Sequence, residues 1–169
     1  MNNRQEVLDR FIKHVVSQAK RNLTTSGKNA SKKLYNSIQG EAKAFPNSIG
    51  IYFDMEDYGF FQDKGVSGIK KKYNTPFSYK TKMPPPGAFD KWTIRRGIAP
   101  RNTKGQFQTR KGLNFAIARS IFEKGIRPSL FFTKPFEAAY KNLPDELIDK
   151  YGLDVIELFD SIMKPNFKK

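Results

Sequence analysis

The hydrophobic pattern near the start of the chain predicts an amphipathic helix. Between positions 4 and 22, apolar residues recur at intervals of three and four, the spacing that places side chains on one helical face. That face consists of Leu8, Phe11, Ile12, Val15, Val16, Ala19 and Leu23. His14 falls off it and is expected to be exposed. A second, short helix is predicted over 30–38, where Leu34 and Ile38 are four residues apart.

After Gly40 the pattern changes from helical spacing to alternation. The segments 41–45 and 48–55 flank Pro46-Asn47, which is typical of a turn. Within the second segment, Ile49, Ile51 and Phe53 alternate with polar or small residues, as expected for a half-buried strand. The pattern therefore predicts two strands. The segment Tyr58–Phe61 begins a short helix or ends a strand, and it closes at Gly65.

Three further helices are predicted downstream. Pro84–Pro86 stiffens the chain as polyproline II and leads into a helix over 88–96. A clearer helix covers 113–123, with Gly125 in the position that ends helices. Its apolar stripe is predicted to be Leu113, Ala116, Ile117 and Ile121. Another helix begins at Pro135, since proline is favoured in a first helical turn.

The predicted core is rich in aromatic side chains, which bury large areas. It is expected to contain Trp92, Phe131, Phe132 and Phe136, together with the apolar faces of the helices. With 169 residues, the chain is long enough for one domain with a true core. We expect an α+β fold: a small, mostly antiparallel sheet packed against several helices, with long basic loops.

The net charge of +15 changes the picture because it is unevenly placed. Residues 62–111 hold thirteen Lys and Arg against only Asp63 and Asp90. Two irregular basic inserts, 66–82 and 97–112, interrupt a domain predicted to span 1–143. The remaining segment, 144–169, is predicted to be an acidic helix over 144–162 followed by a basic tail. Such a basic middle region indicates an anionic partner, either nucleic acid or the acidic surface of another subunit.

Candidate catalytic chemistry is weak throughout. The chain has no cysteine, which excludes a disulfide scaffold and a thiol nucleophile. Asp54, Glu56 and Asp57 are hard oxygen ligands for a divalent metal, but a solvated turn is the simpler interpretation. His14, the sole histidine, is expected on a polar helical face. The glycines around residues 65–71 lack phosphate-loop spacing. We therefore expect no enzyme, with no catalytic residue, cofactor or metal.

Several short segments in a fixed order resemble the phage neck and tail-completion (head-tail joining) proteins. They are Leu34–Ile38, Tyr58–Gly65, Pro85-Pro86 with Trp92, Gly125–Phe132 and Pro135–Ala139. The corresponding family pattern begins with an N-terminal helix that leads to a Leu-x-x-Ser-Ile-like segment, a strand, Tyr-x-x-x-x-[Glu/Asp]-x-Gly and Pro-Pro…Trp. It closes with a helix, here Ala116–Gly125, a Gly-x-x-Pro-x-x-Phe turn, and a last helix that begins near Pro-Phe-x-x-Ala. The likeness covers residues 4–143. The chain departs from it in the inserts 66–82 and 97–112 and in the extension after 144.

The resemblance implies a structural virion protein that forms a closed ring between portal and tail. It implies a homo-oligomer of six or twelve copies that contacts the portal or connector protein and other tail proteins, is assembled in the host cytoplasm, and uses no membrane. A basic lumen would also tolerate passing genomic DNA. The residues predicted to contact portal, subunit or DNA are Lys70, Lys71, Lys72, Arg95, Arg96, Arg101, Arg110 and Lys111.

The alternative function is a basic nucleic-acid-binding accessory protein for packaging or replication. Basic residues interleaved with aromatics, as in Lys71-Lys72-Tyr73 and 106–111, are typical of single-strand binding. We favour the interpretation that these loops pack on a neighbouring subunit, because loops of about 15 residues are uncommon in a compact monomer.

Overall fold

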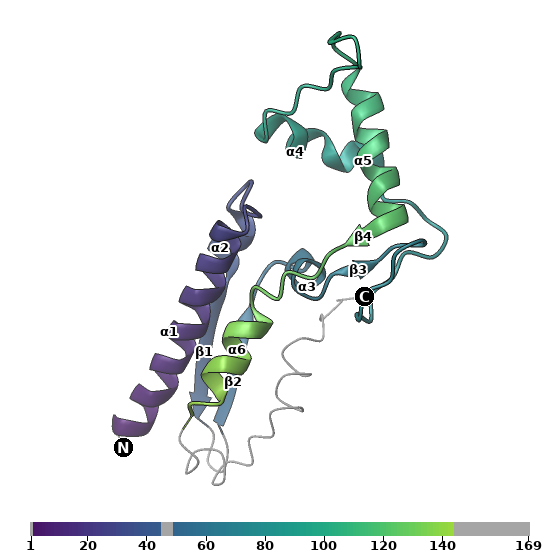
Figure 1. Ribbon diagram of the computed structural model, residues 1–169. Helices are drawn as coiled ribbons and strands as arrows, with labels where there is room; N and C mark the ends of the chain where they lie inside the picture. Colours follow the sequence, from purple (N-terminus) through teal and green to yellow (C-terminus); the bar gives the residue numbers. More distant parts are fainter. Residues whose placement is uncertain (1, 45–48, 144–169) are drawn as a thin grey trace. The chain divides into compact units, whose positions relative to one another are not determined.

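The computed structural model describes residues 2–44 and 49–143 (Figure 1). The fold is organised as two compact units. Unit 1 comprises residues 1–29, 33–63 and 130–169, and unit 2 comprises 30–32 and 64–129. This is a finer division than the one domain expected over 1–143. The predicted helix over 144–162 lies outside the described residues.

The described part of unit 1 is an α+β layer arrangement. Its elements are α1 (Asn2–Thr25), α2 (Lys33–Ser37), β1 (Gln39–Ala44), β2 (Ile49–Asp54), α3 (Tyr58–Lys64, whose last residue belongs to unit 2) and α6 (Thr133–Tyr140). Strands β1 and β2 pair antiparallel, with a register from Gln39 opposite Asp54 to Ala44 opposite Ile49. Helix α1 packs along β1 and α6 packs against α1. The two predicted helices at the N-terminus and the two predicted strands are confirmed.

The alternation in β2 separates a core face from a solvent face. Ile51 and Phe53 are buried, whereas Tyr52 between them is 43% exposed. On α1, the predicted stripe lies inward and His14 is exposed. The sequence pattern therefore identified the correct inner faces of both elements, because one-sided burial imposes its period on the chain.

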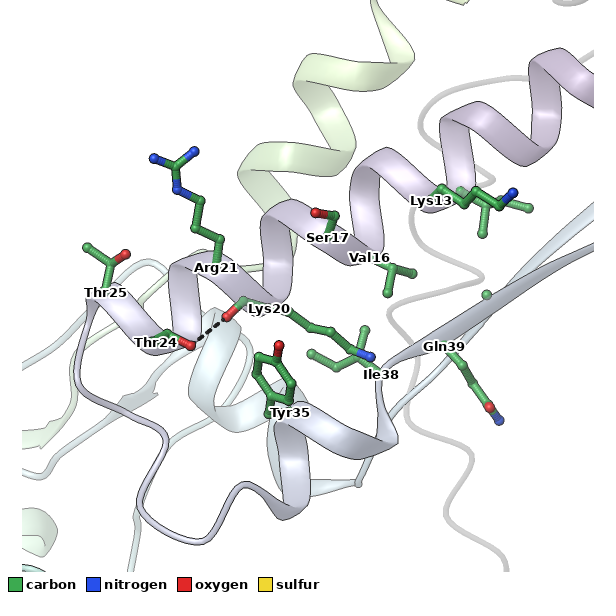
Figure 2. Close-up of a pocket in the computed structure, with 12 residues that line it drawn as sticks. Lys13, Val16, Ser17, Lys20, Arg21, Thr24, Thr25, Tyr35, Ile38 and Gln39 are labelled. Carbon is green, nitrogen blue, oxygen red and sulfur yellow. Dashed lines mark hydrogen bonds between the residues drawn. The ribbon is translucent and has the colours of Figure 1, made fainter.

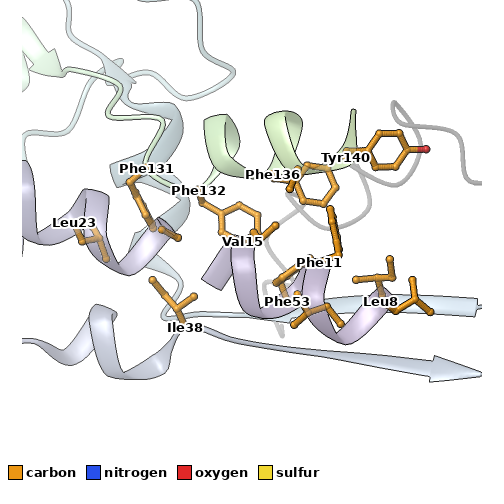
Figure 3. Close-up of a cluster of buried hydrophobic side chains, with 14 of the residues drawn as sticks. Leu8, Phe11, Val15, Leu23, Ile38, Phe53, Phe131, Phe132, Phe136 and Tyr140 are labelled. Carbon is orange, nitrogen blue, oxygen red and sulfur yellow. The ribbon is translucent and has the colours of Figure 1, made fainter. Parts of the chain in front are cut away.

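An aromatic cluster forms the centre of the unit 1 core (Figure 3). Phe53 lies edge-on to Phe132 with ring centroids 5.1 Å apart, and Phe136 lies edge-on to Phe11 at 5.8 Å. Phe131, Phe132 and Phe136 have 1% or less of their surface exposed. Their predicted place in the core is confirmed. Edge-to-face pairs of this kind add to the stabilisation from area burial alone.

Unit 2 has little regular sheet and three helical segments in its described residues. Its elements are β3 (Val66–Ser67), the 3-10 turn η1 (Pro86–Phe89), α4 (Asp90–Arg95), α5 (Arg110–Lys124) and β4 (Gly125–Ile126). Strands β3 and β4 pair antiparallel. The backbone of Ser67 also bonds to Phe77 and Tyr79, so the chain after β3 is held by defined hydrogen bonds. Together, the helices and small antiparallel sheets of the described residues confirm the predicted α+β class.

The interior of unit 2 is partly polar, which corrects two predictions. Thr93 and Asn114 are buried, and the Asn114 amide donates to the Asp90 carboxylate at 3.2 Å. Thr93 is the buried residue of α4, and Trp92 is 39% exposed rather than in the core. On α5, the buried residues are Asn114 and Ala118, and the predicted stripe residue Ala116 is exposed. The other three predicted stripe residues, Leu113, Ile117 and Ile121, are half-buried, so the predicted stripe was wrong only at Ala116.

The second predicted insert, 97–112, is also more regular than expected. Helix α5 starts at Arg110, since Thr109 caps it by accepting a hydrogen bond from the Gly112 amide at 3.3 Å. Arg110 and Lys111 are therefore helical rather than part of a loop. The Gly125 residue that ends α5 has φ 75°, which agrees with its predicted role as a helix terminator.

Candidate functional site

The two units differ sharply in net charge. Unit 2 contains seventeen Lys and Arg against only Asp90 and Glu123, so its formal net charge is +15. The remainder of the chain contains fourteen basic and fourteen acidic residues and is neutral. Unit 2 therefore carries the entire net charge of the protein. Its surface is where an anionic partner would be attracted.

All eight predicted contact residues lie in unit 2 and are exposed. They do not form one cluster. Lys70, Lys71 and Lys72 lie beside the C-terminal end of α5, where the Lys70 amide donates to the Glu123 carbonyl at 2.9 Å. Arg110 and Lys111 lie in the first turn of the same 15-residue helix, about 20 Å away at 1.5 Å per residue.

The three-lysine segment is engaged within unit 2. The Lys70 ammonium is 2.8 Å from Glu123, and the Lys72 ammonium donates to the Gly68 carbonyl at 3.0 Å. Lys71 lies over the ring of Tyr73, 5.4 Å from its centroid. The C-terminal end of α5 exposes backbone carbonyl groups, so the helix dipole also favours cations there. This segment therefore closes the helix end as well as presenting charge.

Glu123 is the anionic centre of that helix end. Hydrogen bonds from Lys70 and from Arg119, whose Nε lies 3.1 Å away, hold the pKa of the Glu123 carboxyl below its usual value. Both cations remain largely exposed, so solvent screens the pairs. One acid is thus shared by two bases, and the surrounding surface keeps a positive excess.

Residues 100–108 form an ordered hairpin, which the sequence analysis had assigned to an irregular loop. Arg101 and Phe107 form an antiparallel bridge, and the Gln108 amide donates to the Pro100 carbonyl at 2.9 Å. The Asn102 side chain organises the turn: its Oδ1 accepts from the amides of Lys104 at 3.0 Å and Gln106 at 2.9 Å. Its Nδ2 donates to the Gln106 side chain at 2.8 Å.

The Arg101 guanidinium lies over the Phe107 ring, 4.0 Å from its centroid. Phe107 is 69% exposed, the largest exposure among the large apolar side chains of the described residues. A second pair of this kind lies on α4, where Arg96 is 6.0 Å from the Trp92 ring centroid. Stacking of this type restrains a guanidinium without neutralising it. The sequence signal for the hairpin was the Asn102-x-x-Gly105 turn, since Gly105 adopts φ 77°.

Unit 1 has a basic groove that no sequence prediction identified (Figure 2). It has a volume of about 740 Å³ and runs between α1 and the α2–β1 segment. Lys13, Lys20 and Arg21 line its α1 side, and the Lys20 ammonium lies 5.4 Å from the Tyr35 ring centroid. The signal was available as basic residues seven and eight positions apart on the predicted helix.

The candidate metal ligands are arranged as structural groups. Glu56 pairs with Lys33 at 2.8 Å, and its backbone amide donates a hydrogen bond to the Ser37 hydroxyl oxygen at 3.0 Å. Among the described residues of unit 1, Asp63 is a fully buried acid, and it accepts hydrogen bonds from the start of α6. Within residues 2–44 and 49–143, no group of three or more His, Cys, Asp or Glu is arranged to hold a metal ion.

No protein-family model, curated protein or solved structure matches this chain. Among the described helices, none combines the length and apolar character needed to cross a membrane. The functional argument therefore depends on the surfaces described above.

Proposed function

We propose that this protein is a structural component of a bacteriophage virion, a ring-forming subunit of the neck or tail that joins the portal to the tail. The observation that carries the proposal is the composition of unit 2. This unit has a charge of +15, few buried apolar residues, and most of the exposed large apolar side chains of the described residues. Those side chains are Ile69, Trp92, Ile94, Ile98, Phe107 and Phe115.

An exposed surface of this kind is costly for a protein that works alone. The free energy falls when a partner covers large apolar side chains that are exposed to solvent in a single copy. The charged residues between them would select an acidic partner surface. The sequence of the chain contains a matching excess of acid, because 144–162 has six acidic residues and one lysine. A ring requires two different complementary surfaces on each subunit, since its interface is heterologous and repeats until it closes.

The resemblance of the ordered sequence segments supports the same function. The acid of the Tyr-x-x-x-x-[Glu/Asp]-x-Gly segment is Asp63, and it bonds to the start of the helix in the Pro-Phe-x-x-Ala segment. The two segments therefore depend on each other physically. This link gives a reason for their joint presence, and a neck or tail-completion protein is the function that their order indicates.

The test is the mass and shape of the purified full chain, measured by native mass spectrometry and electron microscopy, alone and with the portal protein of the same virus. A closed ring, or a stoichiometric complex with portal, is expected. The variant Trp92→Ala/Ile94→Ala/Phe115→Ala should weaken the assembly, while Tyr52→Ala, which removes an exposed aromatic side chain of unit 1, serves as a control. A protein that remains monomeric under all these conditions contradicts the proposal.

A basic nucleic-acid-binding accessory protein is the second candidate. The Arg101–Phe107 pair favours it, because aromatic and guanidinium surfaces together are suited to nucleic acids. A monomer that ignores portal but binds DNA with a steep salt dependence would favour this function over the ring.

A further inference from the structure

We propose that the hairpin 100–108, together with the first turn of α5, is a preorganised contact for the phosphate backbone of nucleic acid, without sequence specificity. We call residues 100–108 and the first turn of α5 the hairpin surface. The inference rests on the proposed function, because a ring at the DNA exit channel meets the genome. The inference adds which part of the subunit contacts the DNA.

The first support is the charge of the surrounding sequence. From residue 91 to 122 the chain contains eight Lys and Arg and no acidic residue. On the hairpin surface these are Arg101, Lys104, Arg110 and Lys111, and all four are exposed. Lysine is depleted in protein–protein interfaces, whereas nucleic-acid interfaces carry much more positive charge. The hairpin surface matches the second description.

The second support is the direction of α5. Its first turn contains Arg110 and Lys111 and no acid, at the end of the helix where the backbone dipole is positive. Cations at this end are unfavourable for the helix by itself. A phosphate placed there would be attracted by both side chains and by the helix end.

The third support is the order within the hairpin. Asn102 bonds to the amides of Lys104 and Gln106 and to the Gln106 side chain, and the Arg101 guanidinium donates to the Gly105 carbonyl at 3.0 Å. The Phe107 ring also packs on this guanidinium, with its centroid 4.0 Å away. A loop that needed a partner for its order would lack these bonds. Because the Arg101 guanidinium and the backbone of the turn are already positioned, less conformational entropy is lost on binding.

The experiment measures binding of the full-length protein to a fluorescent 20-bp DNA duplex of random sequence, by anisotropy, over a series of salt concentrations. For the variant Arg101→Ala/Lys104→Ala, the slope of log K against log[salt] should fall in magnitude by about two, since each lost phosphate contact removes about 0.9. The matched control is Lys134→Ala/Lys141→Ala, which removes two exposed charges from unit 1 and should leave the slope unchanged.

A second variant tests preorganisation without any change of charge. Asn102→Ala should weaken binding several-fold and leave the salt slope unchanged, because the phosphate contacts remain but their order is lost. Asn74→Ala, a change at an exposed asparagine elsewhere in unit 2, should have no effect. Circular dichroism spectra should be the same for all four variants, because each substituted side chain lies outside the core.

Two outcomes would overturn the inference. One is equal loss of DNA affinity in the unit 1 control, which would mean that binding follows net charge alone. The other outcome combines two results. DNA binding does not respond to the hairpin variants, or is absent near 150 mM salt, and at the same time Arg101→Ala/Lys104→Ala prevents ring formation. That result would make the hairpin surface a subunit contact and leave the proposed function intact. DNA binding that is weakened by the hairpin variants, in a protein that forms no ring, would support the inference and contradict the proposed function.

Discussion

The carboxylate of Asp63 caps the helix that begins at Thr133, seventy residues further along the chain. It accepts hydrogen bonds from the amides of Phe132 at 2.8 Å and Thr133 at 3.2 Å, and from the Thr133 hydroxyl. The first amides of a helix have no partner within it, and an anion there is also favoured by the dipole. Asp63 is fully buried, so these bonds take the place of its water.

Replacing Asp63 by alanine should destabilise unit 1 strongly. The change leaves two buried amides and one hydroxyl without their acceptor, and the expected loss is about 3 kcal/mol of unfolding free energy. Urea unfolding followed by far-UV circular dichroism measures it. Asp63→Asn retains the size and one acceptor oxygen and should cost less. Equal stability of Asp63→Ala and the native protein would show that the cap is unimportant.

Phe132→Ala should cost about 3–5 kcal/mol, because the side chain is fully buried among other aromatic rings and the cavity cannot collapse easily. Phe107→Ala provides the comparison, since the same atoms are removed from a side chain that is 69% exposed. Its unfolding midpoint should stay close to that of the native protein. Thermal unfolding of the two variants checks the contrast, and similar losses in both would contradict the assigned core.

Gly125→Ala should disrupt the pairing of β3 with β4. Gly125 has φ 75°, and a Cβ at this position would overlap the carbonyl oxygen of Val66. Gly97→Ala is the control: it has φ 61° but open space around it, so it should cost only the backbone penalty of about 1 kcal/mol. Trp92 is the only tryptophan and lies in unit 2, so its fluorescence reports urea unfolding of that unit. Equal midpoints for the two variants would contradict the close approach.

Acidification should loosen the contact between the three-lysine segment and the C-terminal end of α5. The pKa of Glu123 is lowered in the folded protein by Lys70 and Arg119, so the stabilisation from these pairs is present above the unfolded value of 4.5. It is lost as the pH falls through the lower folded pKa. Nuclear magnetic resonance titration of the Glu123 carboxyl checks the direction. Lys70→Ala should move this pKa back toward 4.5, and an unchanged pKa would show that Lys70 does not contribute.

The sequence determined the elements whose burial is one-sided and apolar. The stripe from Leu8 to Leu23, the alternation of Ile51 and Phe53, and the aromatic run at Phe131 and Phe132 each had to face a core. Periodicity reports burial directly when hydrophobic contact is the dominant force. The excess of cations in the middle of the chain was also visible in the sequence alone. The eight predicted contact residues were chosen from it, and all of them are exposed in the structure.

Tertiary structure decided the arrangements that depend on polar partners. Trp92 lies outside and Asn114 inside because Asp90 and Thr93 satisfy the Asn114 side chain, and no hydrophobic scale contains that information. The hairpin at Asn102 and the separation of the lysine segment from Arg110 likewise depend on specific hydrogen bonds and on the length of α5. In the sequence, Asp63 was the acidic position of the Tyr58–Gly65 segment, with no structural role assigned to it. Only the fold, by bringing it to Thr133, made it the cap of a distant helix.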